Sequence, residues 1–405
     1  MKIFTKKFAL VLIGILLFVV FFGVLLLYKD QKQDLLDGKG EKRVEIFDSY
    51  IKGYDGVKLY WEIQAKYIWL ERNDYIFFAR DVVGGKIFNE QIQEIVSKIK
   101  AKKIRVNSKI KILTAQGNIS AELAFLNKEN ERIVAFVTAE KLAYYHGLKT
   151  LVLDGNVVFE FADLKIRANK IKVDTQKNLI YIKSDFEIEA TDFKIKGKNL
   201  SFEVGANKFE IKEKFRGEKE ALSLDNASAQ NKIKFTANYL KYLKKKRGYT
   251  LFLKDDVRVM QAGKELRCLE VVYDTENDTF KASGDLEIDM DQLAGLMQPE
   301  KRKNLKNKDM KRAIEQPVQI KGQELYFNGQ KKELILTGGI DIAQKTSHIT
   351  CDEVRYDGNS NQISFINNVK IDSLHKNILK AQKFVVDIDK EEFWAEKGEA
   401  TGSKK

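Results

Sequence analysis

After residue 43, hydrophobic and polar residues alternate along the chain in short runs. Phe159 and Phe161 flank Glu160, and the run Leu164–Ala168 repeats the same alternation. A period of two residues is typical of antiparallel strands with one buried face and one solvated face. The pattern therefore predicts a mainly β protein, and the Asp, Asn and Gly residues between the runs predict tight turns.

The alternating runs recur at a nearly fixed interval. Most of the apolar residues that mark the repeat are 29 to 31 residues apart. A period of this size is typical of a stacked architecture, in which one unit is too small to bury its own apolar face. An ordinary β-sandwich with similar hairpins is the alternative. The two longer gaps, Val204 to Tyr242 and Tyr273 to Phe327, predict insertions or boundaries. The recurring residues are Tyr144, Val173, Val204, Tyr242, Tyr273, Phe327, Tyr356 and Val386.

Three segments break this pattern. The segment Phe88–Ile99 has apolar residues at helical spacing and predicts a short helix. Two runs rich in Lys and Arg, 98–111 and 299–317, are interpreted as solvated insertions, and contact with phosphates or with a partner is the alternative.

The segment Phe8–Tyr28 contains no charged residue and ends without a small-residue cleavage site. As a helix it would be about 31 Å long, which is enough to cross a bilayer core. Lys2, Lys6 and Lys7 precede it. Because positive charge favours the cytoplasmic side, we predict an uncleaved single-pass anchor with a cytoplasmic N-terminus. Residues 29–43 would form a tether, and the remainder would lie outside the cytoplasm.

The chain has 405 residues and a formal net charge of +13, from 71 Lys and Arg against 58 Asp and Glu. A basic excess favours anionic partners, such as a membrane surface or a phosphorylated glycolipid, although a solvated lysine-rich surface gives the same composition. Nucleic acid fits poorly with a domain outside the cytoplasm. The sequence therefore predicts no nucleic-acid partner.

The residues that usually carry chemistry form no motif. His146, His348 and His375 lie in no metal-ligand or nucleophile pattern, and no nucleotide-binding loop occurs. We predict no enzyme activity, no catalytic residues, no metal and no cofactor. Cys268 and Cys351 are interpreted as buried small hydrophobic residues, and a disulfide between them is the alternative.

The order of these features resembles a known family. The anchor is followed by a strand through Trp61 and by recurring turn-then-strand motifs, and together they resemble LptC, the inner-membrane-anchored periplasmic component of lipopolysaccharide export. The repeats from about Leu222 onward resemble the related OstA/LptA-type domain. The segments that carry the resemblance are Tyr54–Lys66, Leu113–Gly117, Val137–Leu142, Leu153–Val157, Ala168–Val173, Leu336–Ile340 and Phe365–Val369.

The resemblance implies a transmembrane helix followed by two stacked antiparallel β-jellyroll modules. The expected domains are an anchor at 1–28, a tether at 29–43, an LptC-like module at 44–217 and an OstA/LptA-like module at 218–405 with the basic insertion 299–317. The chain is about twice as long as a typical LptC. Whether the second module replaces a separate bridge protein stays open.

The resemblance further implies a carrier of lipopolysaccharide between the inner and outer membranes, with acyl chains held in an apolar groove between sheets. Expected partners are lipopolysaccharide, the membrane domains of an Lpt-type ABC transporter and an LptA-like or outer-membrane bridge protein. A membrane-tethered structural or adhesion module that binds protein or cell wall is the alternative, and a wall-active hydrolase is a weaker one. The groove candidates are Val157, Phe159, Ile166, Ile171, Val173, Ile180, Ile182, Phe186, Ile188, Ile195 and Phe202.

Overall fold

The computed structural model describes residues 42–71, 75–91, 93–220, 232–292, 311, 314–373 and 377–401. The predicted anchor at 8–28 and almost all of the predicted tether lie outside these residues, as do His375 and most of the basic run 299–317. Within the part that the structure describes, no helix is long and apolar enough to cross a membrane.

The described chain is mainly β, as the alternation predicts, and its strands pair antiparallel wherever a register is defined below. Its contacts divide it into two compact units. Unit 1 comprises the described residues up to 125, with 134–159 and 172–176, and unit 2 comprises 126–133, 160–171 and the described residues from 177 onward. The predicted module boundary at 217/218 falls inside the strand β14 (Phe215–Glu220).

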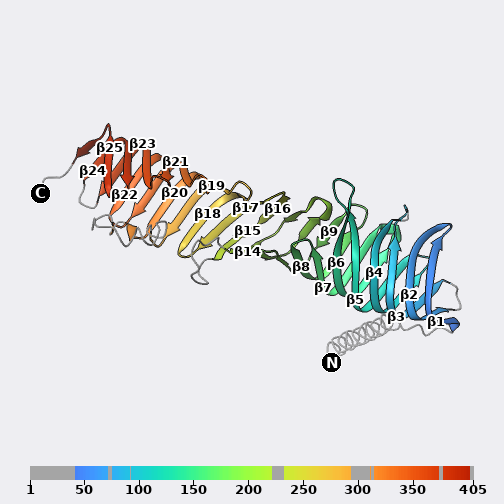
Figure 1. Ribbon diagram of the computed structural model, residues 1–405. Helices are drawn as coiled ribbons and strands as arrows, with labels where there is room; N and C mark the ends of the chain where they lie inside the picture. Colours follow the sequence, from blue (N-terminus) through green and yellow to red (C-terminus); the bar gives the residue numbers. More distant parts are fainter. Residues whose placement is uncertain are drawn as a thin grey trace, which may run out of the picture. The chain divides into compact units, whose positions relative to one another are not determined.

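Unit 1 is a meander of long strands, and β1 to β5 lie side by side in chain order (Figure 1). Trp61, Ile87 and Val96 are opposite one another on successive strands and are almost fully buried. The elements are β1 (Lys42–Asp55), β2 (Lys58–Glu71), β3 (Ile76–Phe88), β4 (Glu94–Asn107), β5 (Ile112–Leu126), β6 (Arg132–Tyr145), the 3-10 helix η1 (His146–Leu148) and β7 (Thr150–Phe161).

The predicted helix at Phe88–Ile99 is wrong, because β3 ends at Phe88 and β4 begins at Glu94. The apolar spacing that suggested a helix comes from a bulge at Lys98, where φ is +51° and the pairing with β5 shifts register. One extra residue in a strand changes the period of two locally, so that the pattern imitates a helix. The basic run 98–111 is likewise no insertion, because most of it belongs to β4.

Unit 2 begins with short strands that form two ladders. In the first, which we call half-sheet A, β9, β12, β13 and β16 pair in succession and reach the first half of β17. In the second, half-sheet B, β8, β10, β11, β14 and β15 pair in succession and reach the second half of β17. The bounds are β8 (Leu164–Asp174), β9 (Leu179–Ile182), β10 (Phe186–Glu189), β11 (Phe193–Gly197), β12 (Leu200–Glu203), η2 (Val204–Ala206), β13 (Lys208–Ile211), β14 (Phe215–Glu220), β15 (Lys232–Ala237), β16 (Tyr239–Lys245) and β17 (Gly248–Gln261).

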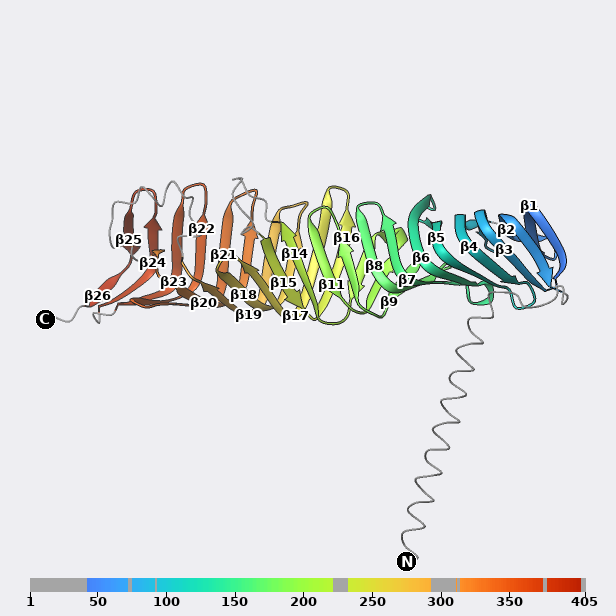
Figure 2. The same ribbon diagram turned by 90° about the horizontal axis from the view of Figure 1, so that it is seen from below.

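From β17 onward, single long strands serve both half-sheets. Each of these strands pairs with the next and shifts register near its middle, and β20 to β24 lie side by side in both views (Figures 1 and 2). The last strand of this series pairs with β25 on one half and with β26 on the other. The bounds are β18 (Lys264–Asp274), β19 (Thr279–Met290), β20 (Val318–Asn328), β21 (Glu333–Gln344), β22 (Ser347–Asp357), β23 (Gln362–Ser373), β24 (Ile378–Asp387), β25 (Glu392–Glu396) and β26 (Glu399–Thr401).

The register shifts mark sharp bends inside the strands. At Gly338 and Gly339 φ is +92° and +68°, and at Asn367 and Asn368 it is +60° and +50°. Glycine adopts this left-handed backbone without strain, and asparagine tolerates it better than most residues. The sequence motifs around these positions predicted turns between strands. That prediction is wrong, because each motif is a bend within one strand that carries it from one half-sheet to the other.

Six of the eight recurring apolar residues are the second-last residues of β6, β8, β18, β20, β22 and β24, whereas Val204 begins η2 and Tyr242 lies in the middle of β16. From β18 onward, one repeat consists of two antiparallel strands. The two longer gaps are confirmed as insertions between directly paired strands. Glu220 of β14 is opposite Lys232 of β15, and Met290 of β19 is opposite Val318 of β20. Most of the residues between the members of each pair lie outside the described chain.

Candidate functional site

The inner faces of the two half-sheets carry continuous rows of apolar side chains. Residues that are directly opposite on neighbouring antiparallel strands point to the same face, so the strand registers define these rows. Row A, in half-sheet A, consists of Ile180, Phe202, Phe209, Tyr242, Leu251, Tyr273, Phe280, Phe327, Leu334, Tyr356, Ile363 and Val386. Row B, in half-sheet B, consists of Ile166, Ile188, Ile195, Gly217, Phe235, Val259, Leu266, Ile288, Ile320, Ile342, Ile349, Ile371 and Leu379.

Both rows begin fully buried and become accessible along the chain. In row A, Phe202 and Phe209 are 0% exposed, whereas Phe327 is 38% exposed. In row B, Ile195 is 0% exposed, whereas Ile320 is half-buried. We call the inner faces of β8 to β16 the closed section, and we call those of β18 to β24, where several apolar side chains are partly accessible, the open groove.

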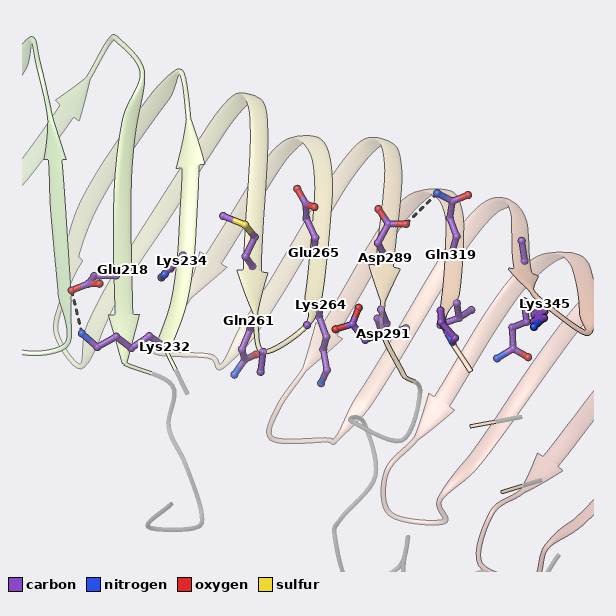
Figure 3. A pocket seen from close by; sticks show the side chains of 18 residues that line it. Glu218, Lys232, Lys234, Gln261, Lys264, Glu265, Asp289, Asp291, Gln319 and Lys345 are labelled. Atoms are coloured by element: carbon purple, nitrogen blue, oxygen red, sulfur yellow. Dashed lines mark hydrogen bonds and ion pairs between the residues drawn. The ribbon is translucent and has the colours of Figure 1, made fainter. Parts of the chain in front are cut away.

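Exposure varies along each long strand, and it is lowest beside the bends. Residues beside the bends, such as Ala282, Ile340 and Val369, are at most 2% exposed. Phe280 and Ile288, which lie nearer the ends of the same long strands, are half-buried. The strands arch over from one half-sheet to the other (Figure 3). An apolar floor with partly accessible apolar walls is suited to bind an aliphatic chain.

All eleven predicted groove residues are buried, at 5% exposure or less. Val157, Phe159 and Val173 lie in unit 1, and the other eight lie in unit 2. None of them lies between β18 and β24, so they line closed core rather than the open groove. Their role in binding lipid stays a prediction.

The sequence interpretation missed the open-groove residues, including Phe280, Ile320 and Phe327. Their alternation is as regular as that of the chosen residues. Aligning successive repeats by their 29 to 31 residue interval would have placed them on the same rows.

A hollow of about 1050 Å³ lies at the rim of the groove, at the ends of β17 to β21. Its lining consists of the inner-face residues nearest these strand ends and of outer-face residues next to them. The inner-face members are Gln261, Lys264, Met290, Val318 and Gln344, and the outer-face members include Lys234, Met260, Glu265, Asp289, Gln319 and Ala343. Figure 3 shows Gln261, Lys264 and Asp291 at the strand ends, with Glu265, Asp289 and Gln319 further along the strands.

The rim of this hollow carries charges of both signs. Burial lowers the pKa of Lys264, because a desolvated ammonium loses hydration. Gln319 donates a hydrogen bond to Asp289 at 3.1 Å, and Lys232 pairs with Glu218 at 3.3 Å. A lysine beside apolar Met290 can contact an anionic headgroup whose tail enters the groove.

Two of the three histidines, His146 and His348, lie in the part of the chain that the structure describes. The ring of His146 lies 4.7 Å from that of Tyr60, and burial is the largest of the effects that lower its pKa. His348 lies 2.9 Å from Asp341. Among the residues described, no group of three or more His, Cys, Asp or Glu residues is placed to hold a metal ion.

Cys268 and Cys351 are free and buried, which confirms that they act as small core residues. They lie beside the bends of β18 and β22, on the inner face of the open groove. Burial raises the pKa of the Cys268 thiol to about 12 and that of the Cys351 thiol to about 11. Both are therefore protonated at neutral pH.

The chain was compared with known families and solved structures. Residues 136–279, from β6 to the start of β19, match the model of the family described as LptA/(LptD N-terminal domain) LPS transport protein. Among solved structures, the chain is similar to LptH, described as the LptA homologous periplasmic component of the conserved lipopolysaccharide transport device from Pseudomonas aeruginosa. The identity is 15%, with 40% of this chain and 80% of that chain covered and a TM-score of 0.18. A comparison with curated proteins found no match.

Proposed function

We propose that this protein is a non-enzymatic carrier of lipopolysaccharide that forms part of a bridge between the inner and outer membranes. The observation that carries the proposal is the pair of apolar rows that become accessible from β18 to β24. The match of residues 136–279 to a family of lipopolysaccharide transport proteins supports it.

The acyl chains of the lipid lie between rows A and B in the open groove. Each CH₂ group that leaves water contributes about 0.8 kcal/mol, so several buried methylenes offset the cost of ordering a chain. Lys264 and Lys345 at the rim meet the phosphates of the headgroup. The carrier has no bond to make or break, and an ATPase partner supplies the direction of transport.

The same proposal places the protein in the inner membrane through the anchor at 8–28, with the strands in the periplasm. It receives lipid from the membrane domains of an Lpt-type ABC transporter and passes it to an LptA-like or outer-membrane bridge protein. An LptC-like module and an OstA/LptA-like module divide this work.

Photocrosslinking tests the carrier function. A photoreactive amino acid replaces Ile320, which is half-buried on the inner face, or Lys321, which is exposed on the outer face of the same strand. In cells with an active transporter, we expect lipopolysaccharide adducts at 320 and none at 321. Equal adducts would mean surface contact alone, and their absence at every open-groove position would favour the structural or adhesion module.

A further inference from the structure

The mouth of the interior is bridged where the closed section meets the open groove. Lys219, the second-last residue of β14, extends from half-sheet B toward Tyr249 and Tyr273 of half-sheet A. Its ammonium lies 5.5 Å and 5.6 Å from the centres of the two rings, and its side chain is 10% exposed. Tyr249 is the second residue of β17 and Tyr273 is the second-last residue of β18. The contact therefore joins the ends of strands and lies away from the bends.

Hydrogen bonds join the bridge into one unit. The Lys219 ammonium donates to the Tyr249 hydroxyl at 2.9 Å and pairs with the Asp192 carboxylate. The Tyr249 hydroxyl donates to the same carboxylate at 2.6 Å. Asp192 lies just before β11 in half-sheet B, so both half-sheets contribute to the triad. Hydrogen bonds to charged partners in a partly desolvated site are stronger than those between neutral groups.

Aromatic rings seal the space next to the triad. Phe193 of half-sheet B packs edge-on against Tyr249, with ring centres 5.4 Å apart, and lies 5.7 Å from Tyr242. Phe193 is 3% exposed and Tyr242 is 1% exposed. Behind these rings lies Leu251, which is opposite Tyr242 and Tyr273 on its two neighbouring strands and is 4% exposed.

We infer that Asp192, Lys219 and Tyr249 form a latch that closes the mouth between the half-sheets, so that an acyl chain passes between the open groove and the closed section only when this latch breaks. The inference rests on the proposed function for the identity of the chain that passes. The existence of the latch does not rest on the proposed function, because the latch controls access to the interior whether or not lipid is present. An ionic triad can open reversibly, whereas a sealed apolar core offers no such point.

Thiol labelling measures the latch without lipid. In the full chain, Cys268→Ala and Cys351→Ala remove the native thiols, and Leu251→Cys places one thiol behind the latch. We expect Lys219→Met and Tyr249→Phe each to raise the rate of maleimide labelling at 251 about tenfold, since each removes a hydrogen bond to a charged group. Lys194→Met is the matched control, because it breaks an outer-face pair with Glu189 at 2.8 Å on the strand next to β14.

A charge exchange separates a latch from a merely structural contact. Asp192→Lys alone places two cations together and should speed labelling, and Asp192→Lys with Lys219→Asp should restore slow labelling. Unchanged labelling in all the single variants, or a double variant that labels as fast as Asp192→Lys, would overturn the inference. Loss of thermal stability in proportion to labelling would also overturn it, because labelling would then report unfolding.

Lipid adducts then test the two proposals separately. With a photoreactive residue at Phe202, deep in the closed section, Lys219→Met should increase lipopolysaccharide adducts. If labelling at 251 rises but no open-groove or closed-section position ever forms an adduct, the carrier function fails and the latch stands. If adducts at Phe202 are as abundant in the unaltered chain as in Lys219→Met, the latch fails and the carrier function stands.

Discussion

The closed section and the open groove are built from related strands, yet their inner-face side chains differ in exposure. In the closed section large rings meet, as in the stack of Phe209 on Tyr242 with ring centres 4.6 Å apart. In the open groove the same row, row A, also holds large rings, but Phe280 is half-buried and Phe327 is 38% exposed. Side-chain size along the row is therefore similar in both parts, and burial depends on which side chains meet across the half-sheets, as Phe193 meets Tyr249.

The largest expected effect is the difference in stability between two phenylalanines of row A. Phe202 is 0% exposed and contacts the rings of Phe161 and Phe209, whereas Phe280 is half-buried. Phe202→Ala should lower the free energy of unfolding by about 4 kcal/mol, because it leaves a cavity in close-packed core. Phe280→Ala should cost about 1 kcal/mol, since part of that side chain already contacts water. Chemical denaturation of both variants measures the difference, and equal losses would mean that the groove is packed.

A second comparison uses two glycines at matched inner positions. A methyl group at Gly217 would lie 2.2 Å from the ring of Phe235, whereas at Gly322 the nearest atom is Ile340 Cδ1 at 3.1 Å. Gly217→Ala should destabilise the protein by about 2 kcal/mol, because the buried ring of Phe235 would have to move. Gly322→Ala should cost less than about 1 kcal/mol, because a side-chain end beside the groove can shift. Thermal unfolding of the two variants tests this order, and a reversed order would contradict it.

A smaller effect is expected on the labelling of the native thiols, whose rate should change gradually with pH. Their pKa values of about 12 for Cys268 and about 11 for Cys351 mean that the reactive thiolate is scarce at neutral pH. Maleimide labelling of both thiols should therefore rise with pH through pH 10 without a plateau. Timed labelling followed by mass spectrometry measures both rates. Bound lipid should slow both, and a plateau near pH 8 would show that the thiols are exposed.

The smallest effect is expected on the outer surface. Lys232 and Glu218 form a pair at 3.3 Å between side chains that are 47% and 38% exposed. Lys232→Ala should change the free energy of unfolding by less than about 0.5 kcal/mol, because solvent screens such a pair. Denaturation of this variant checks the outcome. A loss above 1 kcal/mol would show that the rim of the hollow is more tightly packed than its exposure indicates.

The sequence predicted the strands and the repeat interval because alternation and spacing are local properties. It also placed both insertions, since each one lengthens the repeat. It did not predict the bends: at Gly338 and Asn367 a turn between strands and a bend within a strand require the same residues. The bulge at Lys98 suggested a helix because its extra residue changes the spacing of the apolar residues.

The candidate site was only partly predictable. Residues such as Phe159 and Phe202 were correctly expected to face inward, but burial alone does not separate a groove from a core. The distinction depends on which side chains meet across two half-sheets, as Phe193 meets Tyr249. Contacts of that kind join segments far apart in the chain, and no local pattern specifies them.

Lipopolysaccharide adducts at two matched positions test the central claim most directly. A photoreactive residue at Ile320, in the open groove, is compared with one at Phe202, in the closed section, in the otherwise unaltered chain with an active transporter. The account predicts abundant adducts at 320 and few at 202. Equal adducts at the two positions, or adducts at 202 alone, would contradict the division of the interior into an open groove and a closed section.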